Sequence, residues 1–122
     1  MSSNTEVMGG SDEEYPGPNG DTWDQAYLTK LAHLLAKHNI LLKPPDGSQV
    51  STKRKRREAQ SVARALAPPV MSPRLMQLTV ARFLEIYLAK RAELSRGGGG
   101  GMRAAPAWVR AVEAHVRAGA AP

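Results

Sequence analysis

The chain has 122 residues and no cysteine, with 17 Lys and Arg against 11 Asp and Glu, a net charge of +6. This length allows one small domain with a modest core, and the missing cysteine excludes disulfides, thiolate zinc sites and cysteine nucleophiles. The basic balance favours an anionic partner such as nucleic acid. No apolar run reaches the roughly 20 residues of a membrane span, and the acidic start does not match a signal peptide, so we expect a soluble, non-secreted protein.

Residues 1–20 form an acidic segment that is rich in Gly and Pro and nearly free of aliphatic residues. This composition predicts a disordered arm, because it cannot bury a core. Six of the 11 acidic residues precede the first base, Lys30, so an acidic arm is followed by a strongly basic body. Two interpretations stay open: the arm screens non-specific contacts between the body and phosphate, or it only keeps the protein in solution.

The first helix is predicted over residues 23–38, at the start of a helical domain that spans residues 21–96. Thr22 and Gln25 match a capping box at its beginning, and Asn39 suits a left-handed stop at its end. The apolar face consists of Trp23, Tyr27, Leu31, Leu34, Leu35 and His38. The polar face consists of Gln25, Thr29, Lys30, His33 and Lys37. This spacing is typical of an amphipathic helix that buries one face.

After an apolar segment and a Pro- and Gly-rich loop, a basic helix is predicted over residues 51–67. Ser51 or Thr52 can cap its start, and the following prolines end it. Its cations are Lys53, Arg54, Lys55, Arg56, Arg57 and Arg64. A narrow apolar stripe consists of Ala59, Val62, Ala63 and Leu66. We expect this stripe to dock on the helices before and after it.

The five consecutive cations of the basic helix are the strongest functional signal in the sequence. They repel one another and the positive end of the helix dipole, so helix stability alone does not explain their position. At about 100° per residue they surround the helix instead of sharing one solvated face. A polyanion would relieve the repulsion, so the run predicts nucleic-acid contact, with a nuclear import signal or a solvated loop end as alternatives.

The third helix is predicted over residues 73–96, with Ser72 before it and Pro73 at its first position. Its central apolar stripe consists of Met76, Val80, Phe83, Leu84 and Tyr87. The spacing of Met76, Val80, Leu84 and Ile86 also fits a leucine-rich export signal or a partner-binding helix. Because most amphipathic helices fit that loose spacing, a core role is the competing interpretation.

Residues 97–104 are predicted to be a flexible Gly-rich linker, because consecutive glycines lose too much backbone entropy in a helix. The last unit, residues 105–122, contains an amphipathic helix predicted over residues 106–118. The sequence leaves open whether this helix docks on the domain or waits for a partner.

No pattern in the chain predicts catalysis or a bound metal or cofactor. His33 and His38 lie five positions apart, which is not the spacing that brings two imidazoles to one metal. No phosphate-binding loop or nucleophile motif occurs, and the acidic residues of the body are scattered among cations. We therefore expect a non-enzyme without metal or cofactor.

An acidic start, an amphipathic helix, a proline-glycine turn, a basic helix and a leucine-rich segment follow one another along the chain. The stretches that carry this order are Thr22-Trp23-x-Gln25, Leu31-Ala32-His33-Leu34-Leu35, Asn39, Pro44-Pro45-Asp46-Gly47 and Arg54-Lys55-Arg56-Arg57. Over residues 22–66 the chain resembles the Rev proteins of primate lentiviruses, regulatory proteins that export RNA from the nucleus. The resemblance implies RNA binding by residues 53–57, oligomerisation through the flanking apolar faces, and nuclear shuttling.

Together these features predict an all-α fold: a helical hairpin or small bundle of three to four helices with a disordered N-terminal arm. The predicted function is a non-enzymatic nucleic-acid-binding adaptor in the nucleus that shuttles to the cytoplasm, with RNA favoured by the resemblance alone. Two other classes stay open. One is a helical assembly subunit, either a homo-oligomer or a partner of another helical protein, whose basic run is only an import signal; the other is a DNA-binding accessory factor. No membrane partner is expected.

Overall fold

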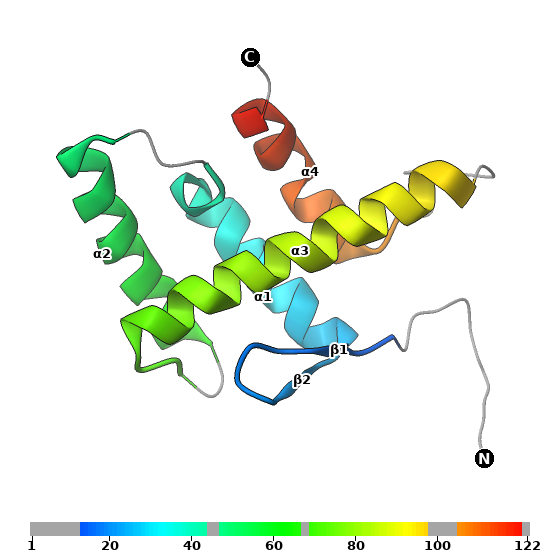
Figure 1. Ribbon diagram of the computed structural model, residues 1–122, viewed down its shortest axis with the longest axis horizontal. Coiled ribbons are helices and arrows are strands. Elements are labelled where there is room, and N and C mark those ends of the chain that lie inside the picture. Colours follow the sequence, from blue (N-terminus) through cyan, green and yellow to red (C-terminus); the bar gives the residue numbers. More distant parts are fainter. Residues whose placement is uncertain (1–12, 44–46, 67–68, 98–104, 121–122) are drawn as a thin grey trace.

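Four α-helices, one 3-10 helix and a two-stranded hairpin make up the part of the chain that the structure describes (Figure 1). The structure is a computed structural model, and it describes residues 13–43, 47–66, 69–97 and 105–120. The elements are β1 (Tyr15–Pro16), β2 (Thr22–Trp23), α1 (Gln25–Lys37), η1 (Asn39–Leu42), α2 (Gln49–Ala65), α3 (Pro73–Gly97) and α4 (Ala107–Ala120). The predicted small helical bundle is confirmed, with the hairpin as an addition.

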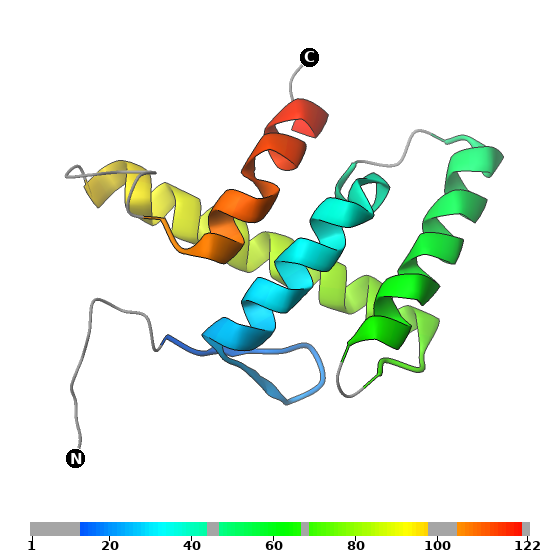
Figure 2. The same cartoon turned by 180° about the vertical axis from the view of Figure 1, so that it is seen from behind.

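The helices form two layers. α3 crosses one side of the molecule, and α1, α2 and α4 lie on its other side, as the two opposite views show (Figures 1 and 2). α1 is in the middle of its layer, with α4 on one flank and α2 on the other, and its closest packing is with α4. The face of this layer that points away from α3 is therefore a helical surface without a covering element among the described residues.

Every helix contributes buried side chains to a single core. Its largest fully buried members are Trp23, Leu28, Leu31, Leu35, Val62, Leu66, Met76, Phe83, Tyr87, Trp108, Val109 and Val112. The Trp108 ring packs edge-on against Phe83 and against Tyr15, with ring centroids 6.1 Å apart in both pairs. The C-terminal helix thus docks on the domain, which answers the question that the sequence left open.

The start of α1 differs from the predicted capping box. The Asp24 carboxylate accepts a hydrogen bond from the Tyr27 backbone N–H at 2.8 Å, so Asp24 and not Thr22 caps the helix. Thr22 is unavailable because it pairs with Pro16 in the hairpin. The expected left-handed stop at Asn39 is also wrong: among the described residues only glycines have positive φ, and Asn39 begins η1.

The predicted arm is shorter than residues 1–20, because residues 13–20 belong to the fold. Tyr15 pairs with Trp23 across the hairpin and packs on the core. The Glu13 carboxylate accepts a hydrogen bond from the Lys90 ammonium at 2.8 Å, and the Pro16 carbonyl accepts one from Arg82 Nε at 2.8 Å. These contacts span more than 60 positions, so the sequence pattern could not show them. Residues 1–12 lie outside the described part, as do the predicted linker residues 98–104.

Candidate nucleic-acid interface

The basic helix α2 begins two residues before the predicted start and ends at Ala65. The Ser48 hydroxyl accepts a hydrogen bond from the Ser51 backbone N–H at 3.3 Å, so Ser48 is the N-cap in place of Ser51 or Thr52. The Thr52 hydroxyl donates to the Ser48 carbonyl at 2.9 Å and further satisfies this first turn. The five consecutive cations therefore lie in the second and third turns, two residues further from the positive end of the helix dipole than the sequence implied.

One face of α2 docks on the core as predicted. Val62, Ala63 and Leu66 are buried, and Ala59 is half-buried against them. On a helix with about 100° per residue, the opposite face holds Lys53, Arg57, Gln60 and Arg64, at positions i, i+4, i+7 and i+11. All four are exposed. Packing of the apolar stripe thus turns these cations away from α3 into solvent.

Two of the five consecutive cations are tied into the fold. Arg54 Nε donates to Glu58 Oε2 at 2.9 Å, and His38 Nδ1 lies 3.0 Å from the other oxygen, Glu58 Oε1. The Arg54 hydrogen bond, supported by His38, lowers the pKa of Glu58. Lys55 Nζ donates to the Lys43 carbonyl at 2.7 Å. The five consecutive cations are therefore not equivalent in this fold: Arg54 pairs with Glu58, which contacts His38 at the end of α1, and Lys55 binds the Lys43 carbonyl after η1.

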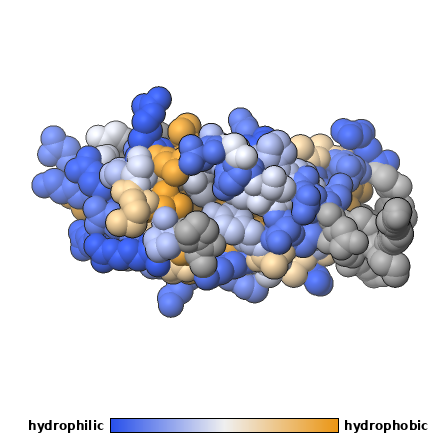
Figure 3. Space-filling view, turned by 90° about the horizontal axis from the view of Figure 1, so that it is seen from below, coloured by the Kyte–Doolittle hydropathy of each residue, from blue (hydrophilic) through white to orange (hydrophobic). Residues whose placement is uncertain are grey.

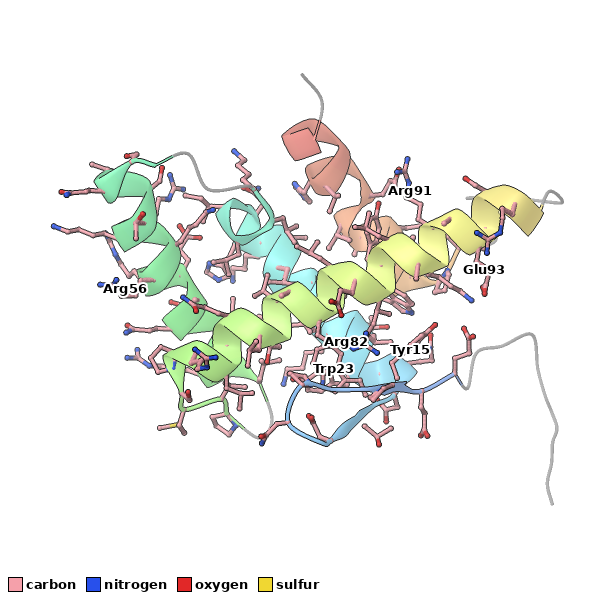
Figure 4. All side chains as sticks on the ribbon, viewed as in Figure 1. Tyr15, Trp23, Arg56, Arg82, Arg91 and Glu93 are labelled. Atoms are coloured by element: carbon pink, nitrogen blue, oxygen red, sulfur yellow. The ribbon has the colours of Figure 1, made fainter. Side chains whose placement is uncertain are left out.

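The remaining cations of α2 are Lys53, Arg56, Arg57 and Arg64, and we call them the α2 row. All are exposed, and within the described part of the chain none of their side chains has a hydrogen bond or an ion pair. Arg56 projects from the outer side of α2, away from the other helices (Figure 4). The α2 row is therefore a set of uncompensated positive charges that protein contacts leave available for an anion.

The cations of α3 behave in the opposite way, because each of the three central ones has a partner. Arg82 pairs with Glu85 at 3.1 Å, Lys90 with Glu13 and Glu93 at 2.8 Å each, and Arg91 with Glu113 at 3.3 Å (Figure 4). Burial lowers the pKa of Lys90, but its hydrogen bonds to Glu13 and Glu93 outweigh burial and raise it. The centre of α3 is thus close to neutral, whereas α2 carries four exposed cations whose side chains have no partner among the described residues.

The four residues with the spacing of an export signal pack in or against the core. Met76 and Ile86 are buried, while Val80 and Leu84 are half-buried against the core. Thr79 is also buried and donates its hydroxyl hydrogen to the Leu75 carbonyl at 2.8 Å, so the buried stripe runs through Thr79 and not through Val80. A receptor would meet these four side chains together only if α3 left the bundle.

The described residues hold no group of three or more potential metal ligands. His33 is exposed on α1, whereas His38 contacts Glu58. Among these residues, no helix combines the length and the apolar character needed to cross a membrane.

The sequence identified the cations of α2, but it did not show that Arg54 and Lys55 have protein partners while the α2 row is exposed. The Arg54–Glu58 pair has the i, i+4 spacing that favours an ion pair on a helix, so this signal was present in the sequence. The Lys55 contact with the Lys43 carbonyl depends on the path of the loop between them and has no sequence signal.

Comparison of the chain with protein-family models, with curated proteins and with solved structures gives no match.

Proposed function

We propose that this protein is a non-enzymatic nucleic-acid-binding adaptor whose α2 row contacts the phosphate backbone. The observation that carries the proposal is the contrast between helices: the central cations of α3 have carboxylate partners, whereas the α2 row has none among the described residues. Uncompensated like charges on one face destabilise a helix slightly, and neutralisation by phosphates would release condensed counterions and drive binding. RNA is the favoured target because of the resemblance to Rev proteins, which also supports nuclear import and shuttling.

The decisive test removes the three cations that lie along one line of α2. Lys53→Gln, Arg57→Gln and Arg64→Gln together keep helix propensity and delete three positive charges. We expect at least a tenfold loss of affinity for a short RNA, and a salt dependence shallower by about two to three units of log affinity per log salt. Affinity should be measured by fluorescence anisotropy across a salt titration, with circular dichroism to check helix content.

A matched control removes charge from α3. Arg74→Gln and Arg96→Gln change exposed residues near the two ends of that helix, and should leave affinity within about twofold. Equal affinity of the α2 variant and the parent for RNA and for DNA would contradict the proposal. Parallel titrations with DNA of the same sequence distinguish an RNA adaptor from a DNA-binding accessory factor.

A helical assembly subunit is the second candidate, and exposed apolar side chains favour it. Val50, Met71, Leu78 and Leu88 are exposed large hydrophobic residues. Seen from below, a mainly hydrophilic surface carries a group of hydrophobic side chains left of centre (Figure 3). Leu88, which is 54% exposed on α3, is the most direct probe. If self-association or capture of a helical partner depends on Leu88 while nucleic acid does not bind, this second function replaces the first.

A further inference from the structure

A second line of cations lies on α1. Lys30, His33 and Lys37 occur at i, i+3 and i+7 and are all exposed. Leu28, Leu31, Ala32 and Leu35, which are fully buried, occupy the opposite face of the same helix. These three residues form the α1 row, and no other described residue pairs with any of them.

The α1 row and the α2 row lie on neighbouring helices, and both rows are on faces that do not meet α3. α1 and α2 lie next to each other in one layer, and α3 crosses the other side of that layer (Figures 1 and 2). Each helix buries the face that meets α3 and the core, so its outward face points away from α3. The chain runs in opposite directions through the two helices, so the α1 row and the line of Lys53, Arg57 and Arg64 in the α2 row are antiparallel.

The acidic residue between the two rows is already neutralised. Glu58 accepts from Arg54 on its own helix and contacts His38 directly after α1. By contrast, Glu13, Glu93 and Glu113 engage cations of α3 on the other side. Within α1 and α2, Glu58 is thus the only carboxylate beside the seven basic residues of the two rows.

This surface exposes no Phe, Tyr or Trp ring on which bases could stack. All six aromatic residues of the chain are described, and each of them is buried or half-buried. Proteins that hold single strands combine a basic groove with aromatic side chains on which successive bases stack. A face of cations whose only exposed ring is the His33 imidazole can contact phosphates, but it has none of the large aromatic rings that favour unpaired bases.

We propose that the α1 and α2 rows together form a face for double-helical nucleic acid, with each row contacting one of the two phosphate backbones that border a groove. Neighbouring helices with side chains are each about 10–12 Å across. An A-form RNA duplex has a wide, shallow minor groove, across which proteins contact both backbones with little regard to sequence. Along α1 the row spans about 10 Å, and along α2 about 16 Å, at about 1.5 Å per residue. This inference rests on the proposed nucleic-acid function and names its substrate class: a duplex bound by its backbone.

The test compares the full chain and three variants on a 20-base-pair RNA duplex and on one strand of it, each by anisotropy across a salt titration. The α1 variant carries Lys30→Gln and Lys37→Gln, the α2 variant is the triple variant described above, and the control carries Arg74→Gln and Arg96→Gln. For the α1 variant we expect a fivefold or greater loss of duplex affinity and a salt slope shallower by about two units, since each duplex phosphate contact contributes about 0.9. Its affinity for the single strand should change by less than twofold.

The outcomes separate this inference from the proposed function. If the α2 variant loses affinity and the α1 variant binds duplex like the parent, the two-row face is wrong and the nucleic-acid function stands. If neither variant differs from the parent, both are wrong. Tighter binding of the parent to the single strand than to the duplex would also overturn the duplex assignment. So would binding to vesicles of anionic phospholipid that depends on Lys30 and Lys37 and exceeds the affinity for duplex.

Discussion

The indole Nε1 of Trp108 donates a hydrogen bond to Gln25 Oε1 at 2.9 Å, and this contact joins α4 to the first residue of α1 across 83 positions. Trp108 is 1% exposed and also packs against Phe83 and Tyr15. One side chain thus connects the hairpin, α1, α3 and α4. The C-terminal helix is therefore an integral part of the domain and not an appendage.

Substitution of Trp108 should destabilise the whole domain. We expect Trp108→Ala to lower the free energy of unfolding by about 3–5 kcal/mol, because it removes a large buried ring. Trp108→Phe keeps a ring but removes the N–H that donates to the half-buried Gln25, so its cost should be smaller, roughly 1–3 kcal/mol. Urea unfolding followed by circular dichroism measures both. Unchanged stability of the Ala variant would mean that α4 does not dock.

Phe83 is 0% exposed and is at the centre of the buried face of α3. We expect Phe83→Ala to cost about 3–5 kcal/mol. Leu88→Ala on the exposed face of the same helix is the matched control and should change stability by about 0.5 kcal/mol or less. If Phe83→Ala left thermal unfolding unaltered but kept the protein in the nucleus, α3 would act as an exposed export signal and not as core.

Residues 13–20 should contribute to stability, although residues 1–12 should not. Removal of residues 1–12 leaves the Glu13–Lys90 pair and the packing of Tyr15 intact, whereas removal of residues 1–20 deletes both. We expect the shorter deletion to shift the thermal midpoint by less than about 2 °C and the longer one by more than about 5 °C. Equal midpoints for the two deletions would mean that the hairpin does not hold its place on the helices.

Alkaline pH should weaken the same hairpin through Tyr15. Burial, with help from Glu13, raises the pKa of Tyr15 to about 12, against about 10 in an unfolded chain. The folded state favours the neutral phenol of Tyr15. The contribution of this phenol to stability is therefore fully present below pH of about 10 and is lost as pH rises from about 10 to 12. Urea midpoints at pH 8 and pH 11 should fall further for the parent than for Tyr15→Phe. An equal fall in both proteins would contradict this account.

The sequence predicted the features that depend on local spacing. The stripe of Val62, Ala63 and Leu66, the Ser72 start of α3 and the helical class all follow from periodicity and capping, and the structure confirms them. The fold adds what depends on distant contacts. Thr22 does not cap α1 because it pairs with Pro16 in the hairpin. Residues 13–20 belong to the fold and not to the arm, because Tyr15 packs on Trp108 and Glu13 pairs with Lys90.

For the candidate site too, local spacing predicts some features and distant contacts determine the others. That Lys53, Arg57 and Arg64 share a face is readable from their spacing of four and seven residues. That this face is free follows only from the packing of α2 on α3, and that Lys55 is engaged follows only from the position of the Lys43 carbonyl. Local sequence thus predicts which cations can act together, and tertiary contacts decide which of them are available.

Acid should weaken the link between α1 and α2. Because Arg54 and His38 hold the pKa of Glu58 below its usual range, the contribution of Glu58 is present above pH of about 4.3 and is lost as pH falls through its folded pKa. We therefore expect Glu58→Gln to be less stable than the parent at pH 7 and equally stable near pH 3. Glu14→Gln, at an exposed position of the chain, serves as the control and should follow the parent at every pH. A constant difference between the Glu58 variant and the parent from pH 7 to pH 3 would rule out an ionic link.

The consecutive cations of α2 should differ in what they do, although the sequence makes them look equivalent. Arg54 bonds Glu58, whereas Arg57 is exposed and lies on the line of the α2 row. Arg57→Gln should therefore reduce duplex affinity by about threefold to fivefold, reduce the salt slope by about one unit and leave stability unchanged. Arg54→Gln should lower the stability of the fold by up to about 1 kcal/mol, because its pair with Glu58 is partly exposed, and should change affinity less than Arg57→Gln does. Anisotropy titrations and urea unfolding of these two single variants measure both effects. Equal losses of affinity would show that Arg54 leaves Glu58 when nucleic acid binds, and that all consecutive cations act as one charge cluster.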